Sequence, residues 1–161
     1  MIALRDKGYV KSIGVSNFSP RHVEELIAAK LEAPTIMQSE VHLMLQQPTL
    51  RSFCEEHSIL LQGYGHHKPE MSQHTLLTQV ASALGNLPTG QPLTLGLLSM
   101  RWALQSAVAL IPRSRKTEYI ESNQRVFDFA LPPEAMKVLI SADANTSLYG
   151  LHEVFVRDGV R

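Results

Sequence analysis

Short apolar runs alternate with amphipathic stretches along most of this chain. The β-branched residues Val10, Ile13 and Val15 predict a strand that ends at Val15. Further strands are predicted at residues 35–40, 59–64 and 108–112. The run Ile59-Leu60-Leu61 is apolar without interruption, which is typical of a strand that is covered on both faces.

A helical pattern follows each of these strands. Val23, Leu26 and Ile27 form one apolar stripe at i, i+3 and i+4, and Ser19 followed by Pro20 is a typical helix start. The pattern predicts helices at residues 20–30, 47–56, 75–83, 93–105, 117–126 and 133–141, an irregular loop at 65–70, and a helix end at 1–7 capped by Gly8.

Four successive strand–helix units predict a parallel sheet with right-handed crossovers. Eight such units make a closed (β/α)8 barrel, which takes roughly 250 residues, so four units in 161 residues predict half of such a barrel as one α/β domain. Residues 142–161 are expected to form a C-terminal tail. Because a half barrel has two unpaired edge strands, we expect a homodimer through those edges, a longer parent protein, or low stability.

Composition narrows the functional classes. Apolar residues make up 44% of the chain and charged residues 19%, which indicates a globular, soluble protein, and the formal net charge of zero gives no attraction to nucleic acid or to an anionic membrane. No run approaches the roughly 18 apolar residues of a membrane helix, and the apolar start is too short for a signal peptide. A single cysteine, Cys54, fits a reduced, cytoplasmic compartment.

Two segments follow predicted strands and precede predicted helices, where parallel α/β proteins bind ligands. The first is Ser16-Asn17, for which the simpler alternative is a turn shaped by polar side chains. The second is Arg113-Ser114-Arg115-Lys116, whose three cations and hydroxyl suit a phosphate group; its simpler alternative is a solvated basic loop.

Other polar clusters have simpler interpretations. The adjacent His66 and His67 would point in opposite directions in an extended segment, so no metal site is expected there. Glu40 and His42 are interpreted as ordinary polar residues at a strand end. The chain contains no phosphate-binding P-loop, CxxC, GxSxG or GxGxxG motif.

The segment Gly14-Val15-Ser16-Asn17-Phe18 resembles the GVSNF signature of the aldo-keto reductases. Further matches follow in the family's order, namely Gln38, Leu45-Gln46-Gln47, Phe53-Cys54-Glu55-Glu56-His57, Tyr64, Ile111-Pro112-Arg113-Ser114, Asn123 and Val126-Phe127-Asp128-Phe129. These matches span nearly the whole chain, but they correspond only to the second half of an aldo-keto reductase barrel.

The resemblance implies an NADP cofactor and a role for individual residues. Ser16, Asn17 and Gln38 would hydrogen-bond the nicotinamide carboxamide, and the ring of Tyr64 would stack on the nicotinamide. At the other end of the cofactor, Arg113 takes the place of a family lysine at the 2′-phosphate. The residues that would assist it are Ser114 at the same phosphate, Arg115 as an additional charge, and Asn123 at the adenine.

The chain also departs from the family pattern. Tyr119 stands where the family usually has an arginine, Ser122 where it has Glu or Gln, and Met37 where it has an asparagine. Gly65-His66-His67 replaces a Ser-Pro-Leu that usually cradles the pyrophosphate, and imidazoles there are expected to occupy phosphate space.

The family reduces carbonyl compounds with a tyrosine, an aspartate, a lysine and a histidine, all from the first half of the barrel. None of the four matches a residue of this chain, so the catalytic set is empty here. Three hypotheses follow: the cofactor-binding half of an NADPH-dependent aldo-keto reductase acting on aldehydes or ketones, a non-catalytic NADP(H)-binding or interaction module, or a degenerate truncated paralogue.

Overall fold

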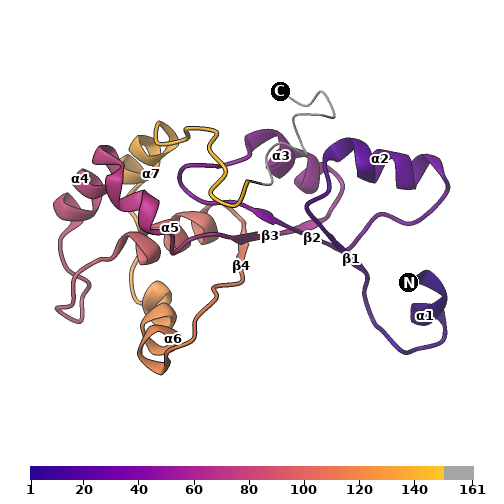
Figure 1. Cartoon of the computed structure of the whole chain (residues 1–161), viewed down its shortest axis with the longest axis horizontal. Helices are drawn as coiled ribbons and strands as arrows, with labels where there is room; N and C mark the ends of the chain where they lie inside the picture. The colour runs from indigo at the N-terminus through magenta and orange to yellow at the C-terminus, as the bar shows by residue number, and fades with distance from the viewer. Residues whose placement is uncertain (151–161) are drawn as a thin grey trace.

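Four parallel strands form one sheet in the order β1-β2-β3-β4 (Figure 1). A computed structural model describes residues 1–150 of the chain. The strands are β1 (Gly14–Ser16), β2 (Ile36–Glu40), β3 (Leu60–Tyr64) and β4 (Ala109–Leu110). Three of them lie within the predicted strand segments, and β1 extends one residue beyond the predicted end at Val15. The shortest strand is β4, in which two residues pair with β3. This confirms the predicted parallel sheet of half a barrel.

The helices also fall where the apolar periodicity predicts them. They are α1 (Ile2–Asp6), α2 (Pro20–Ala28), α3 (Pro48–Glu56), α4 (Thr75–Leu84), α5 (Leu95–Gln105), α6 (Thr117–Gln124) and α7 (Pro133–Ile140), with 3-10 turns η1 (Pro69–Gln73) and η2 (Arg125–Phe127). The structure differs from prediction at η1, since the segment expected to be irregular up to residue 70 enters a 3-10 turn at Pro69.

Local sequence explains how α2 begins directly after the first site segment. The Ser19 side chain accepts a hydrogen bond from the His22 backbone N–H, while the His22 ring accepts one from the Ser19 N–H. Pro20 occupies the first helical position, where the missing N–H leaves no bond unmade. This reciprocal cap ends the turn that starts at Ser16 and fixes the residue at which the helix begins.

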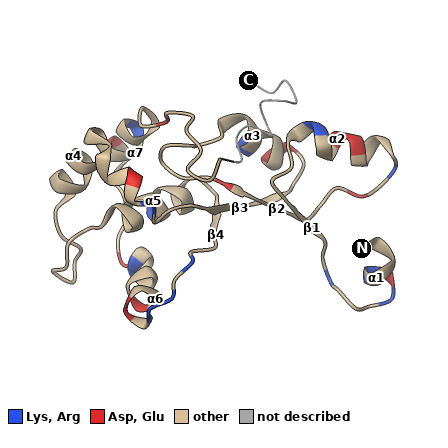
Figure 2. Ribbon diagram, in the orientation of Figure 1, with Lys and Arg blue, Asp and Glu red and all other residues tan. Residues whose placement is uncertain are grey.

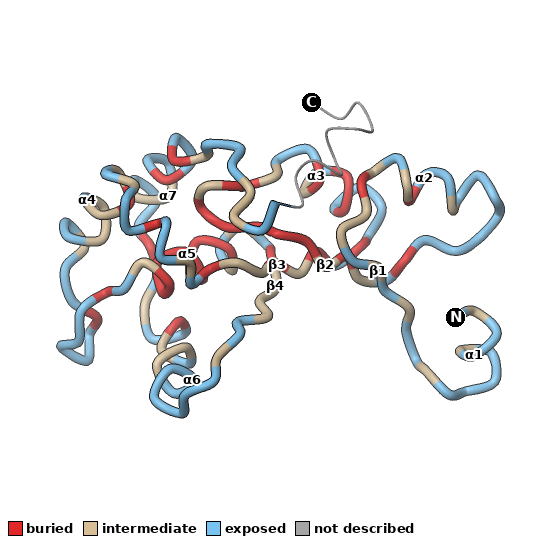
Figure 3. Tube along the Cα trace, in the orientation of Figure 1, coloured by how far each residue is buried: buried red, intermediate tan, exposed pale blue. Residues whose placement is uncertain are grey.

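One face of the sheet carries the core. Met37 and Leu61, at opposed positions of β2 and β3, are buried under the helices together with Trp102 of α5 (Figure 3). Their neighbours Ile36 and Leu60 are opposed in the same register but point to the other face, where Leu60 is 48% exposed. In a closed barrel this second face is the interior, so here the barrel interior lies open.

The N-terminal helix lies apart from this core. None of the residues of α1 is buried, and the helix is joined to β1 by an extended segment (Figure 1). An ion pair between Arg5 and Glu32 ties it to the turn that follows α2. Glu32 is largely exposed, so this pair contributes little to stability.

The described part of the tail after residue 142 has no helix or strand, but hydrogen bonds hold it against the domain. The backbone N–H groups of Ala144 and Thr146 both donate to the Met44 carbonyl, at 3.2 and 3.1 Å. The segment 144–149 therefore docks beside the carboxyl end of β2, and we call it the strap. The rest of the predicted tail, residues 151–161, lies outside the described residues.

We predict that two adjacent residues of β2 differ sharply in their contribution to stability. Met37→Ala removes a fully buried side chain and should lower the free energy of unfolding by about 2–5 kcal/mol. Ile36→Ala changes the open face and should lower it by about 1 kcal/mol or less. Urea unfolding measures both values, and similar losses for the two variants would contradict a sheet with one open face.

Candidate functional site

The parallel register brings predicted site residues from three strands to one edge of the sheet. Ser16 of β1 lies opposite Gln38 of β2, and Gln38 lies opposite Gln62 of β3. Two residues further along the strands, Tyr64 of β3 lies opposite Glu40 of β2. The carboxyl ends of parallel strands share an edge, so this arrangement follows from the pairing itself.

Asn17 lies in the turn between β1 and the N-cap of α2. Its φ of 56° is left-handed, a conformation that asparagine adopts more readily than most residues. In this conformation its backbone N–H donates to the Gln38 carbonyl at 2.8 Å, and its side-chain Oδ1 accepts from the Tyr64 hydroxyl, also at 2.8 Å. Asn17 therefore links all three strands at the site.

The Tyr64 hydroxyl is held as a donor. Burial and the nearby negative charge of Glu40 raise its pKa, and the hydrogen bond to Asn17 opposes this only in part. The phenol is therefore protonated at neutral pH. Because its oxygen is fixed by Asn17, the ring has one orientation at the sheet edge.

Two amides at this edge keep hydrogen-bonding capacity. Gln38 Nε2 donates to Gln62 Oε1 at 2.7 Å, which leaves the Gln38 oxygen outside that bond. In the same way, the Asn17 amide nitrogen takes no part in the bond from Tyr64. One amide oxygen and one amide N–H₂ at the same sheet edge suit a ligand carboxamide, which needs a donor and an acceptor.

The basic segment lines a separate cavity of about 620 Å³. Arg113, Ser114, Arg115 and Lys116 form one side of it, between β4 and α6, where Figure 2 shows a line of basic residues. The remaining lining residues are His66, His67, Lys68, Pro69, Met71, Thr94, Gly96, Tyr119, Ser122 and Asn123. These lining residues include four permanent cations and no carboxylate.

The eight predicted residues thus form two groups. Ser16, Asn17, Gln38 and Tyr64 gather at the edge of β1, β2 and β3. Arg113, Ser114, Arg115 and Asn123 gather around the basic cavity. Lys68, four residues beyond Tyr64, lies between the two groups in the sequence and lines the cavity.

The two histidines after β3 point to different environments. His66 is buried, its Nε2–H donates to the Gly63 carbonyl at 3.2 Å, and its Nδ1 accepts from the Ser99 hydroxyl at 3.1 Å. Burial lowers the pKa of His66 to about 3, so it stays neutral and structural. Both histidines line the basic cavity, but hydrogen bonds with Gly63 and Ser99 hold the His66 ring in the core. The expectation that imidazoles occupy phosphate space stays a prediction.

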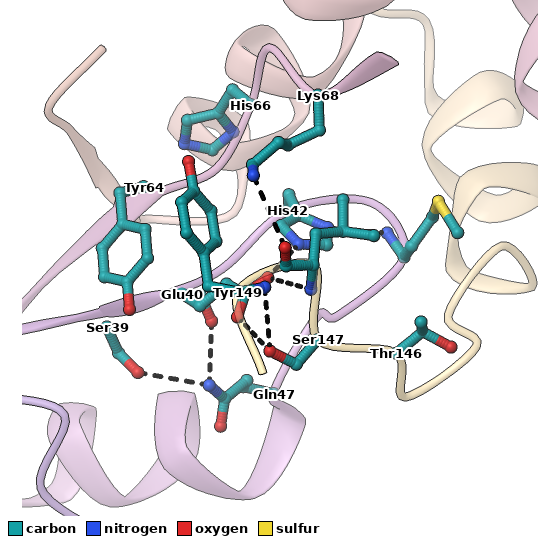
Figure 4. A network of polar contacts seen from close by, with 12 residues as sticks. Ser39, Glu40, His42, Gln47, Tyr64, His66, Lys68, Thr146, Ser147 and Tyr149 are labelled. Carbon is teal, nitrogen blue, oxygen red and sulfur yellow. Dashed lines mark hydrogen bonds and ion pairs between the residues drawn. The ribbon is translucent and has the colours of Figure 1, made fainter. Parts of the chain in front are cut away.

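Sequence reasoning missed a buried polar network below the strap (Figure 4). Glu40 is 1% exposed and accepts hydrogen bonds from His42 Nε2 at 2.9 Å, from the Leu148 backbone N–H at 2.6 Å and from the Ser147 hydroxyl. The Nδ1 atom of His42 accepts from the Met44 N–H. Glu40 and His42 are therefore not ordinary strand-end residues. That interpretation failed because the strap partners of Glu40 lie about a hundred residues away, where no local pattern predicts them.

The network positions an aromatic ring beside Tyr64. Tyr149 follows the two strap residues that Glu40 holds, and its ring lies edge-to-face with that of Tyr64 at a centroid distance of 5.3 Å. The Lys68 ammonium lies 3.7 Å from the centre of the Tyr149 ring, and it also donates to the Leu148 carbonyl. The strap thus borders both residue groups of the site.

Two further properties concern the described part of the chain. Within residues 1–150, no three His, Cys, Asp or Glu side chains come together in a way that could hold a metal ion. No helix in the same range is long and apolar enough to cross a membrane.

Comparisons with known proteins agree with this geometry. The family model described as "Aldo/keto reductase family" matches residues 1–144. An aldo-keto reductase of Mycolicibacterium vanbaalenii is 33% identical over 146 residues, which cover 91% of this chain and 50% of the relative. One of Mycobacterium bovis is 35% identical over 140 residues, covering 86% of this chain and 47% of the relative.

Solved structures show the same relation. An aldo-keto reductase from a Medee basin deep-sea metagenome library aligns with a TM-score of 0.79 at 28% identity, over 91% of this chain and 53% of that one. An aldo/keto reductase of Brucella melitensis aligns with a TM-score of 0.77 at 28% identity, over 88% and 52%. This chain spans about half the length of the relatives that it matches.

We predict that Glu40→Gln loosens the strap and changes the response to acid. Burial alone would raise the pKa of Glu40, but the hydrogen bonds from His42, Ser147 and Leu148 outweigh it and leave the pKa below its ordinary value. The stability gained from this shift is complete above the ordinary glutamate pKa of about 4.5 and is lost as the pH falls through the lower folded-state value.

Urea unfolding at several pH values tests this prediction. At neutral pH Glu40→Gln should lower the free energy of unfolding by about 1–3 kcal/mol, because an amide N–H₂ would face donors. Part of the acid destabilisation of the natural chain should disappear in the variant. Glu25→Gln, whose partner is the exposed Arg21, is the matched control and should change little. Equal acid profiles for the natural chain and Glu40→Gln would contradict the network.

Proposed function

The chain belongs to the aldo/keto reductase family, and from this premise we propose that it is the cofactor-binding half of an NADPH-dependent oxidoreductase. The family relationship favours an oxidoreductase acting on small carbonyl compounds over a non-catalytic module or a degenerate paralogue. We propose aldehydes and ketones as the substrates of the complete barrel and alcohols as its products.

The observation that carries this proposal is the basic cavity. Arg113, Arg115, Lys116 and Lys68 line it without a carboxylate among the lining residues, so it attracts an anion. Arginine side chains suit phosphate oxygens because their N–H groups form paired, charge-assisted hydrogen bonds. A volume of about 620 Å³ is in the usual range for ligand pockets. We assign it to the adenosine phosphate end of NADPH, with Asn123 at the adenine.

The second residue group supports the other end of the same cofactor. Asn17 and Gln38 offer one amide N–H₂ and one amide oxygen at the sheet edge, and Ser16 adds a hydroxyl beside them. We propose that these groups orient the nicotinamide carboxamide. Tyr64, whose ring is fixed through Asn17, would then provide the stacking platform.

The division of labour in the reaction follows from these positions. When bound, the cofactor supplies a hydride to the carbonyl carbon. Residues of this chain hold and orient the two ends of the cofactor, and the protonated Tyr64 hydroxyl is engaged with Asn17 rather than directed at a substrate. The general acid must therefore come from outside this chain, in keeping with the family's use of residues from the other half of the barrel.

We also propose a cytoplasmic location. Burial raises the pKa of the single cysteine, Cys54, to about 11, so the thiol stays protonated and is a packing group in the core. Such a residue suits a reducing compartment.

We predict that Arg113→Ala weakens NADPH binding by about tenfold to a hundredfold, since a charge-assisted hydrogen bond contributes about 1.5–3 kcal/mol. Binding is measured by isothermal titration calorimetry on the purified chain. Arg21→Ala removes the same charge from α2, far from the cavity, and should leave the affinity unchanged. Equal losses of affinity in both variants would mean that only the net charge of the chain matters. Unchanged binding in Arg113→Ala would overturn the assignment of the cavity.

The open barrel interior leads to a second proposal, that two copies of the isolated chain associate through it. In a closed barrel β1 must pair with a parallel strand edge such as that of β4, and a two-fold pair of chains supplies both junctions at once. Leu60 is 48% exposed on the interior face and would be covered in such a pair.

We therefore expect Leu60→Lys to weaken self-association by at least about tenfold, because a charge would be buried on the interior face that the pair covers. Sedimentation velocity over a concentration series measures this. Ile140→Lys, at an exposed position of α7, is the matched control and should not affect association. A natural chain that is monomeric at all concentrations would contradict the pairing.

A further inference from the structure

We propose that His67 is an additional ligand for a phosphate group in the basic cavity and that it takes up a proton when the phosphate binds. The inference rests on the assignment of the cavity to a phosphorylated nucleotide, and it concerns a residue at which this chain departs from the family pattern.

His67 is an exposed residue whose ring lines the cavity and lies against α5. A Cβ atom added at Gly96, in the first turn of α5, would come within 2.1 Å of His67 Nδ1, so the ring rests directly on the helix backbone there. On its other side the ring donates a hydrogen bond to the side chain of Asn123 of α6. His67 therefore bridges two helices at a place where only a glycine admits it.

The residues that line the cavity around His67 carry a positive charge or none, and the Glu118 carboxylate, which is not a lining group, lies 3.8 Å from the Lys116 ammonium. Its own loop contributes His66, which is neutral, and Lys68. The cavity residues of α5 and its N-cap, Gly96 and Thr94, carry no charge. The segment before α6 contributes Arg113, Arg115 and Lys116, and the cavity side of α6 contributes Tyr119, Ser122 and Asn123.

This environment favours the neutral form of the His67 ring when no phosphate is bound. Burial lowers the pKa of His67, and the hydrogen bond to Asn123 opposes this only in part. No lining carboxylate is available to stabilise an imidazolium. A bound phosphate would supply the missing negative charge, which favours the protonated ring and gives it a charge-assisted hydrogen bond to a phosphate oxygen.

The linkage has a defined sign. A group whose pKa is higher in the complex than in the free protein takes up a proton on binding, so binding weakens as the pH rises. The ceiling for one linked proton is about tenfold in affinity per pH unit. The 2′-phosphate, a monoester, loses its last proton near pH 6, whereas the pyrophosphate has no proton that titrates in this range. The first effect changes affinity in the opposite direction and must be removed by a matched variant.

His67→Gln provides this match, because glutamine can still hydrogen-bond Asn123 but does not titrate. We would measure the dissociation constant of NADPH by calorimetry between about pH 6 and about pH 8 for both chains. The natural chain should weaken by at least about fivefold more than His67→Gln over this range. At about pH 6.5, two buffers of different ionisation enthalpy should reveal proton uptake by the natural chain and less by the variant.

NADH distinguishes the two phosphate sources. If both cofactors show a pH slope that depends on His67, then His67 contacts the pyrophosphate, which both contain. If only NADPH shows this slope, His67 contacts the 2′-phosphate. His57→Gln, which changes a histidine stacked on Phe53 of α3, is the control and should keep the natural slope.

Equal slopes for the natural chain and His67→Gln would overturn the role of His67 while leaving the cofactor assignment intact. A folded natural chain, as judged by circular dichroism, that binds neither cofactor would overturn both. A His67→Gln chain that fails to fold is replaced by His67→Leu, the residue type of the family, with the same two outcomes.

Discussion

Parallel pairing is the constraint on which the rest of this structure depends. Because all four strands run in one direction, their carboxyl ends share an edge, and the polar residues that follow them meet there. Asn17, Gln38 and Tyr64 come from three strands, yet one left-handed residue and two hydrogen bonds join them. The same pairing leaves one face of the sheet under helices and the other open, so the site and the incompleteness of the barrel have a common origin.

The sequence predicts the local features of this fold well, and the reason is physical. Strands and helices are set by periodicity and caps within a few residues, as in the Ser19-Pro20 start of α2. The eight proposed cofactor residues fall into two groups whose positions follow from strand ends. The Glu40 network was not predictable in this way, because Ser147 and Leu148 reach it only after the chain has folded. Likewise, adjacency predicts that His66 and His67 diverge, but which of them enters the core depends on Ser99 and Gly63.

The distribution of charge matters more than its sum. The formal net charge of the chain is zero, which indicates no general affinity for anions. Four cations nevertheless line one cavity with no carboxylate among the lining residues, and the nearby Glu118 lies 3.8 Å from Lys116. Glu25 and Glu32 pair with arginines on other surfaces. A local field of this kind selects a ligand that brings its own negative charge, and a nucleotide with a pyrophosphate does so.

His67 illustrates how such a field changes the meaning of a substitution. In a neutral pocket, replacing a leucine with a histidine would bury a polar group with one partner and would be expected to weaken the site. Here the ring already has a partner in Asn123 and lies on a backbone without a side chain at Gly96, so the packing is satisfied before any ligand arrives. None of the lining residues carries the negative charge that would stabilise a protonated His67, and a bound phosphate would supply it. A departure that the sequence alone presents as damage to a phosphate site is thus, in this structure, a means of making that site responsive to pH.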